Sequence, residues 1–172
     1  MKKINKKSTK DIPTKNYFSV FLITFLIILV CVYARSIYLN HKETIKNTSV
    51  FNDISIKQIN KDDLDFAFEE NNEVILYVSY TGDINVYNME KKLLKEIKNN
   101  RLNDKVVYWD VTNDKNYLEL LKKKYPNIDT EITSAPLFIY IKSGTAVEAM
   151  SSELKMIDSN VLNKLIEKYD IK

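Results

Sequence analysis

The sequence has very few of the residues that carry covalent and metal chemistry. Its 172 residues include one cysteine, Cys31, and one histidine, His41. A single thiol cannot form an internal disulfide or a cysteine-only metal site, and a single imidazole excludes the usual His-rich metal clusters. The Cys–His and Ser–His pairs of nucleophilic catalysis are disfavoured in the same way. We therefore expect no metal site and no cofactor.

Glycine and proline are also scarce, with two and three copies, so turns must be made largely by Asn, Asp, Ser and Lys.

Concentrated positive charge is missing from most of the chain as well. The formal net charge is +3, but residues 1–16 hold six lysines and a single acid, which leaves the remainder slightly negative. Nucleic-acid binding usually needs a concentrated basic face. We therefore expect no nucleic-acid partner.

A long apolar run near the start is the first feature that is present. Residues 17–34 carry no charge. Extended to residue 39, a tilted helix at about 1.5 Å per residue crosses a hydrocarbon layer about 30 Å thick. Tyrosines fall near both ends of the run, where aromatic rings prefer the membrane interface. The pattern predicts a basic tail over 1–16 and a transmembrane helix, acting as a signal anchor, over 17–39.

The lysines of the tail predict the orientation of this helix. Positive charge is retained on the cytoplasmic side of a membrane span. The N-terminus is then cytoplasmic, and everything after about residue 40 lies outside the cell. We expect a single-pass protein of the cell membrane with an extracellular C-terminal domain.

Two other interpretations of the apolar run stay open. Val32-Tyr33-Ala34 fits a secretory signal cut after Ala34, although the run is longer than in typical cleaved signals. Acylation of Cys31, as in lipoproteins, is less favoured because Val30 is larger than the residue that usually precedes such a cysteine. Otherwise Cys31 serves as one more apolar residue of the run.

After a polar stalk over 40–53, the patterns of apolar residues alternate between strand and helix. Strands show alternation or short continuous apolar runs, and helices show apolar residues three and four positions apart. The run at 74–80 is apolar throughout, which is typical of a central strand covered on both faces. The predicted strands are 54–59, 74–80, 105–111, 134–142 and 145–150, and the predicted helices are 61–71 (with Asn60 as N-cap), 84–100, 117–125 and 159–169.

This order, together with two local patterns, resembles the thioredoxin fold. Residues 74–97 align without gaps to the family's strand, active-site turn and helix. Ala135-Pro136, followed by an apolar strand, Lys142 and Gly144, resembles its second signature. The resemblance covers residues 54–172 and implies a three-layer α/β/α domain with a mixed central sheet. A membrane segment before such a domain also resembles the thioredoxin-like bacteriocin transport accessory proteins of low-GC Gram-positive bacteria, on layout alone.

The resemblance places the family's two active-site cysteines where this chain has none. Its buried acid falls at Val78, and its turn tryptophan falls at Asp83. The chemistry needs a thiolate at the start of a helix and a second thiol one turn on. Loss of the CxxC cysteines predicts loss of thiol-disulfide oxidoreductase activity. The four positions of that degenerate motif are Ile84, Asn85, Val86 and Tyr87.

In the family the proline of the second signature is cis and faces the cysteine turn. The resemblance therefore implies a cis bond between Ala135 and Pro136. It also implies that the backbone of Ala135 is free to pair with an extended peptide. With Asp83 from the turn, these residues form a possible peptide-binding wall.

The sequence supports functions of different classes. The favoured hypothesis is a non-catalytic, membrane-tethered domain that binds an envelope protein or an exported peptide, as an accessory to secretion or to peptide maturation. The alternative is a subunit of a thiol-disulfide pathway, or an enzyme that uses non-cysteine chemistry. A third hypothesis is a structural membrane protein that spaces its partners.

Overall fold

The computed structural model describes residues 14–51, 56–64, 71–128, 130–151, 157 and 159–171. The chain divides into two compact units, Met1–Lys42 and Glu43–Lys172. We refer to the second unit as the folded domain.

Helix α1 (Thr14–Asn47) is the one described helix that is long and apolar enough to span a membrane. Its stretch Asn16–Ile45 contains no proline or glycine, and its apolar side chains between residues 17 and 39 are exposed in the structure. Such a helix satisfies its backbone hydrogen bonds internally, as a lipid environment requires. The helix therefore fits a single membrane span and covers the predicted 17–39 segment.

The predicted stalk over 40–53 differs from the structure in two respects. Helix α1 continues through residues 40–47, and Ile45 is buried. Phe51 is 0% exposed and packs against the rings of Tyr77 and Tyr108, with centroid separations of 5.4 Å and 5.0 Å. Isolated apolar residues in a polar stretch are a weak pattern in sequence, but here they join the hydrophobic core.

Five strands form one mixed sheet in the order β1-β3-β2-β4-β5. The strands β1, β3 and β2 run parallel, and β4 and β5 are antiparallel to their neighbours. The mixed sheet is the one that the sequence predicts; residues 54–55 of the first predicted strand lie outside the described residues. The strands are β1 (Lys57–Ile59), β2 (Glu73–Ser79), β3 (Val106–Asp110), β4 (Leu137–Lys142) and β5 (Thr145–Ser151).

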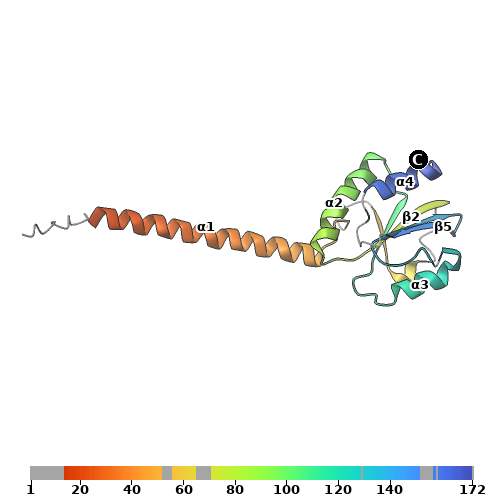
Figure 1. Cartoon of the computed structure of the whole chain (residues 1–172), viewed down its shortest axis with the longest axis horizontal. Helices are drawn as coiled ribbons and strands as arrows, with labels where there is room; N and C mark the ends of the chain where they lie inside the picture. Colours follow the sequence, from red (N-terminus) through yellow and green to blue (C-terminus); the bar gives the residue numbers. More distant parts are fainter. Residues whose placement is uncertain are drawn as a thin grey trace, which may run out of the picture. The chain divides into compact units, whose positions relative to one another are not determined.

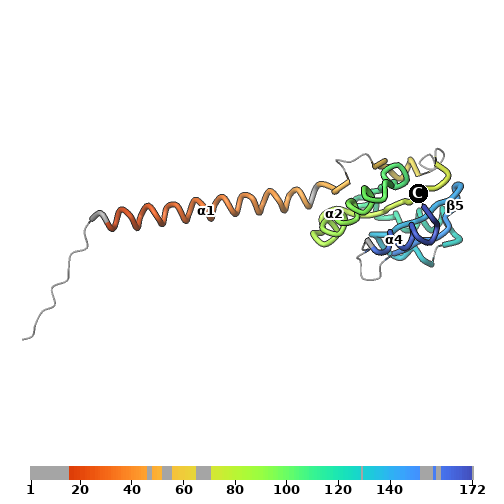
Figure 2. The backbone as a smooth tube through the Cα atoms, turned by 90° about the horizontal axis from the view of Figure 1, so that it is seen from above, coloured from red at the N-terminus to blue at the C-terminus, as the bar shows by residue number. Residues whose placement is uncertain are grey.

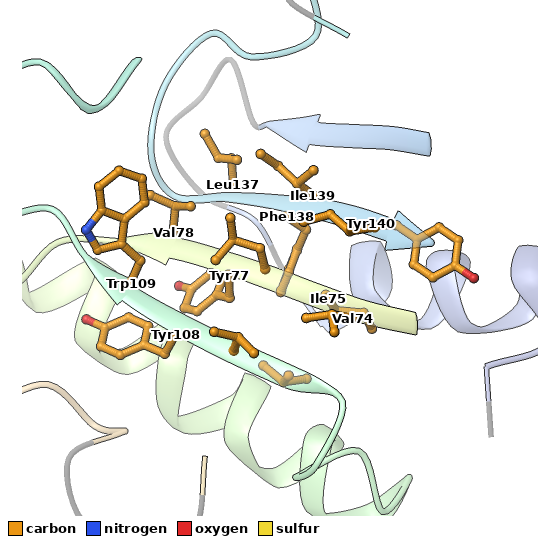
Figure 3. Packing of buried hydrophobic residues seen from close by; sticks show 14 of the residues in the cluster. Val74, Ile75, Tyr77, Val78, Tyr108, Trp109, Leu137, Phe138, Ile139 and Tyr140 are labelled. Carbon is orange, nitrogen blue, oxygen red and sulfur yellow. The ribbon is translucent and has the colours of Figure 1, made fainter. Parts of the chain in front are cut away.

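Strand β2 lies at the centre of the sheet, as its continuous apolar sequence predicts. Residues 74–79 are all buried, between β3 on one side and β4 on the other. Tyr77 is paired with Tyr108 and Phe138, and its ring lies 5.9 Å and 4.8 Å from theirs. Figure 3 shows Tyr77 and Tyr108 below the strands, with Val78 and Trp109 above them on the opposite face of the sheet. Side-chain alternation along a strand therefore separates two halves of the core.

Helices cover both faces of the sheet. Helices α2 (Ile84–Asn99) and α4 (Ser159–Tyr169) contact each other on one face, and α3 (Tyr117–Lys124) covers the other (Figures 1 and 2). This is the three-layer α/β/α arrangement predicted from the sequence. Two short 3-10 helices, η1 (Lys61–Asp63) and η3 (Pro126–Ile128), complete the described elements. The predicted helix over 61–71 begins with η1 after the N-cap Asn60, and residues 65–70 lie outside the described ones.

Candidate functional site

The turn between β2 and α2 is fixed by short-range hydrogen bonds. Gly82 has a φ of +97°, a conformation that favours glycine. Asp83 is the N-cap of α2, and its carboxylate accepts the backbone N–H of Asn85 at 2.7 Å. The backbone N–H of Thr81 donates to the hydroxyl of Thr112, at 2.7 Å, which ties the turn to the end of β3. The helix therefore begins at a defined place, with Ile84 as its first residue.

The four residues Ile84–Tyr87 occupy the first turn of α2. Ile84 is 45% exposed, and Asn85 is exposed beside it. Val86 is buried and anchors the turn on the core, whereas Tyr87 is half-buried with the ammonium of Lys91 4.6 Å from its ring centroid. The helix start thus presents an apolar side chain to solvent and carries no thiol.

The segment Ser134–Pro136 leads into strand β4. The peptide bond between Ala135 and Pro136 is cis. Ala135 is 5% exposed, and its backbone N–H donates to the hydroxyl of Tyr117 at 2.9 Å. Helix α3 therefore supplies an internal partner for the N–H that an extended peptide would otherwise use.

Electrostatics connect this segment to the turn. The pKa of Tyr80 is raised, first by burial and then by the charges of Asp83 and Tyr117. Tyr80 directly follows strand β2, and its ionisation is disfavoured both by the N-cap residue of α2 and by the tyrosine that holds Ala135. Asp83 and Ala135 each already have a hydrogen-bond partner within the folded domain.

Val78, the position that the resemblance assigns to a buried acid, is fully buried and apolar. It lies on the same face as Trp109, whose indole N–H donates to the carboxylate of Asp114 at 3.1 Å (Figure 3). Asp110 accepts the backbone N–H of Thr112 at 2.9 Å. These contacts hold the end of β3. The side chain at position 78 is itself apolar, so it cannot act as the family's buried acid does.

A buried acid does exist on the opposite face, and it was not identified from the sequence. Glu90 of α2 is 2% exposed, and its carboxylate accepts hydrogen bonds from the hydroxyls of Ser79 at 2.7 Å and Tyr77 at 3.2 Å. Burial raises the pKa of Glu90 to about 7, against the opposing effect of these hydrogen bonds. A signal was available: Glu90 lies four residues after Val86 and three before Leu93, within the apolar stripe of the helix.

An open hollow of about 770 Å³ lies away from the Ile84–Tyr87 turn. Its lining includes Lys61 of η1, Asn113 before α3, and Tyr117 and Leu120 of α3. Tyr117 therefore borders this hollow and also holds the Ala135 segment. Within the described ranges, no group of three or more His, Cys, Asp or Glu residues is placed to hold a metal ion.

Solved structures of thioredoxins resemble the folded domain. The thioredoxin f2 of Chlamydomonas reinhardtii matches with a TM-score of 0.50 and 19% identity, over 66% of this chain and 95% of its own. The thioredoxin of Fasciola hepatica matches with a TM-score of 0.49 and 18% identity, over 66% and 98%. Mitochondrial thioredoxin 3 of Saccharomyces cerevisiae matches with a TM-score of 0.48 and 20% identity, over 66% and 95%.

The match to the Chlamydomonas protein, with the mixed five-stranded sheet, shows a thioredoxin-like fold. At this level of identity the likeness concerns the fold alone. No protein-family model matches the sequence, and the comparison with curated proteins gave no significant match.

Proposed function

We propose that this protein is a non-catalytic, membrane-tethered thioredoxin-like protein whose folded domain binds a protein or peptide outside the cell. The observation that carries the proposal is the helix start: the positions aligned to the CxxC motif hold Ile84 and Tyr87, and the folded domain contains no cysteine. Without a thiolate and a resolving thiol, a dithiol exchange cycle cannot run. A fold that keeps the surface but not the thiols is suited to binding.

Ile84 is the centre of the proposed binding surface. Exposed apolar side chains beside polar neighbours are suited to contact with a partner's apolar side chain. The adjacent backbone is less available than the resemblance implies, because the Ala135 N–H already donates to Tyr117. An extended peptide would pair with this N–H only by displacing the Tyr117 hydroxyl. We therefore assign recognition to the Ile84 side chain first, with the Ala135-Pro136 backbone as the opposite wall.

The membrane helix supports an accessory role in the cell envelope. Residues 1–16 hold six lysines, and this asymmetry favours a cytoplasmic N-terminus with the folded domain outside. Tethering confines the domain to the membrane surface, where an exported peptide emerges. This placement suits an accessory role in the secretion or maturation of such a peptide. The layout of the bacteriocin transport accessory proteins implies the same role.

Site-specific crosslinking tests the proposal on the full chain in its native membranes. A photoreactive side chain at Asn85 should give a discrete adduct that disappears when Ile84→Asp is added, because a buried apolar contact does not tolerate an unpaired carboxylate. The matched control places the same photoreactive group at Lys164, an exposed position on α4. Equal adducts from both positions, or an adduct that Ile84→Asp leaves unchanged, would contradict a binding site at the helix start.

A reductase assay separates this function from the thiol-pathway alternative. The purified full chain should not accelerate the reduction of insulin by dithiothreitol, and Cys31→Ser should behave identically. Turnover that Cys31→Ser abolishes would instead assign the chain to a thiol-disulfide pathway, in which it would supply a single thiol to a partner. Turnover that survives Cys31→Ser would indicate non-cysteine chemistry.

A further inference from the structure

Glu90 is a buried acid that is not paired with a basic side chain among the described residues. Its side chain lies between α2 and the sheet, and its exposed fraction is 2%. The ion pairs of the described residues join lysines to Glu73 and Glu148, and no lysine or arginine acts on Glu90. A carboxylate in this position loses its hydration and gains only neutral hydrogen-bond donors.

Three parts of the folded domain close around this carboxyl group. Strand β2 contributes the hydroxyls of Tyr77 and Ser79. Strand β3 contributes Tyr108 and Asp110. The negative charge of Asp110 opposes ionisation of Glu90. The third part is the segment Ser49–Phe51, described next.

The segment Ser49–Phe51 follows helix α1 in the chain and covers Glu90. The backbone of Val50 lies close enough to the Glu90 carboxyl group to favour its ionised form slightly. The N–H of Phe51 donates to the hydroxyl of Ser49 at 3.1 Å, and both of these side chains are buried. The ring of Phe51 lies on Tyr77 and Tyr108, the two tyrosines that line the acid. The side-chain amide of Gln58 on β1 also donates to the backbone carbonyl of Phe51, at 3.1 Å. The segment is thus held by its contact with the acid, by this hydrogen bond and by the Phe51 ring.

We propose that Glu90 is a proton-controlled latch that fastens the segment Ser49–Phe51 onto the folded domain. In the closed state the carboxyl group is dehydrated and prefers to be protonated. If the segment lifts, water reaches Glu90, and the ionised form becomes favourable again. Closure is therefore linked to proton uptake, and opening is linked to proton release.

The direction and size of the linkage follow from the two protonation equilibria. The pKa of Glu90 is about 7 in the closed state, against 4.5 for a freely hydrated glutamate. Because the closed state binds the proton more tightly, the opening equilibrium rises with pH between these values and levels off above about 7. Full rehydration would increase opening about 70-fold between pH 5 and pH 8. Opening releases the three residues Ser49–Phe51 from their contacts with β2, β3 and α2.

Amide hydrogen exchange on the full chain in detergent micelles tests the latch. Protection factors, which correct for the intrinsic effect of pH on exchange, are measured for Val50 and Phe51 at pH 5, 6.5 and 8. We expect both to fall at least tenfold from pH 5 to pH 8 in the native sequence. In Glu90→Gln, which keeps an acceptor oxygen but cannot ionise, they should change less than twofold.

Two comparisons make the test decisive. The amide of Leu76, in the buried centre of β2, reports global unfolding, and Glu96→Gln on the same helix is the matched control variant. Loss of protection at Val50 and Phe51 only in step with Leu76 would overturn the latch, because it would mean unfolding of the whole domain. An unchanged pH dependence in Glu90→Gln would overturn it as well. Circular dichroism in the near ultraviolet checks that the variant is folded.

Discussion

Glu90 has a pKa of about 7 in the folded domain, against 4.5 for a hydrated carboxyl group. The folded state therefore binds this proton more tightly than the unfolded chain does. The free energy of unfolding should be higher at pH 5 than at pH 8, with a Glu90 contribution of at most about 3 kcal/mol that is lost between about pH 4.5 and 7. Urea unfolding of the full chain in micelles at the two pH values measures the difference.

A neutral side chain at the same position should remove this dependence. In Glu90→Gln, the midpoints at pH 5 and pH 8 should nearly coincide, and the variant should be more stable than the native chain at pH 8. Glu148→Gln is a suitable control, since hydrogen bonds from Lys168 and Tyr169 outweigh burial and lower the pKa of Glu148. Its carboxyl group is ionised throughout the range, so that variant should keep the native pH dependence. A pH-independent native chain would contradict the buried environment of Glu90.

At the scale of the element, the start of α2 depends on its cap. Asp83→Ala removes the acceptor for the Asn85 N–H and should lower the free energy of unfolding by about 1 kcal/mol. Asp83→Asn retains a capping oxygen and should cost only about 0.3 kcal/mol through the lost charge at the helix N-terminus. Urea midpoints of the two variants at pH 8 give the comparison. Equal losses would mean that charge, and not the hydrogen bond, holds the helix start.

The elements with strong local periodicity were predictable from sequence, and the contacts between distant side chains were not. The apolar run at 74–80 is sufficient to predict a central strand, and α2 shows its buried stripe directly. The Tyr117 hydroxyl on the Ala135 N–H joins residues 18 positions apart, which only the packing of α3 brings together. Phe51 escaped prediction for the same reason, since a single aromatic residue in a polar stretch has no periodic neighbours.

The candidate site shows the same contrast between local sequence patterns, which were predictable, and contacts between distant side chains, which were not. Alignment to a known pattern was enough to select Ile84–Tyr87, because this stretch follows a central strand and opens an amphipathic helix. The sequence did not indicate that Asp83 is engaged as a cap or that Ala135 has an internal partner. Nor did the vacant acid position at Val78 suggest a buried acid on the other face of the sheet. Only three-dimensional packing decides whether a polar group near a site is available or already satisfied.

At the scale of the whole molecule, one helix determines where the folded domain can act. Helix α1 has a 30-residue stretch, Asn16–Ile45, that is long and apolar enough to span a membrane. Residues 1–16 contain six lysines, whereas acids and bases nearly balance in the region that follows the apolar stretch. This asymmetry predicts that the residues before α1 stay in the cytoplasm and that the folded domain, with α2, lies outside the cell.

Cysteine labelling of intact cells tests this orientation, because the chain has only one native thiol to remove. In a Cys31→Ser background, Asn99→Cys, at an exposed position on α2, should react with a membrane-impermeant maleimide. Ser8→Cys, in the basic tail, should react only after the cells are permeabilised. The opposite pattern would place the folded domain in the cytoplasm and would remove the basis for an envelope partner. Labelled Asn99→Cys protein that is found in the medium and not in the membrane fraction would instead indicate cleavage after Ala34, because α1 would no longer hold the domain at the membrane.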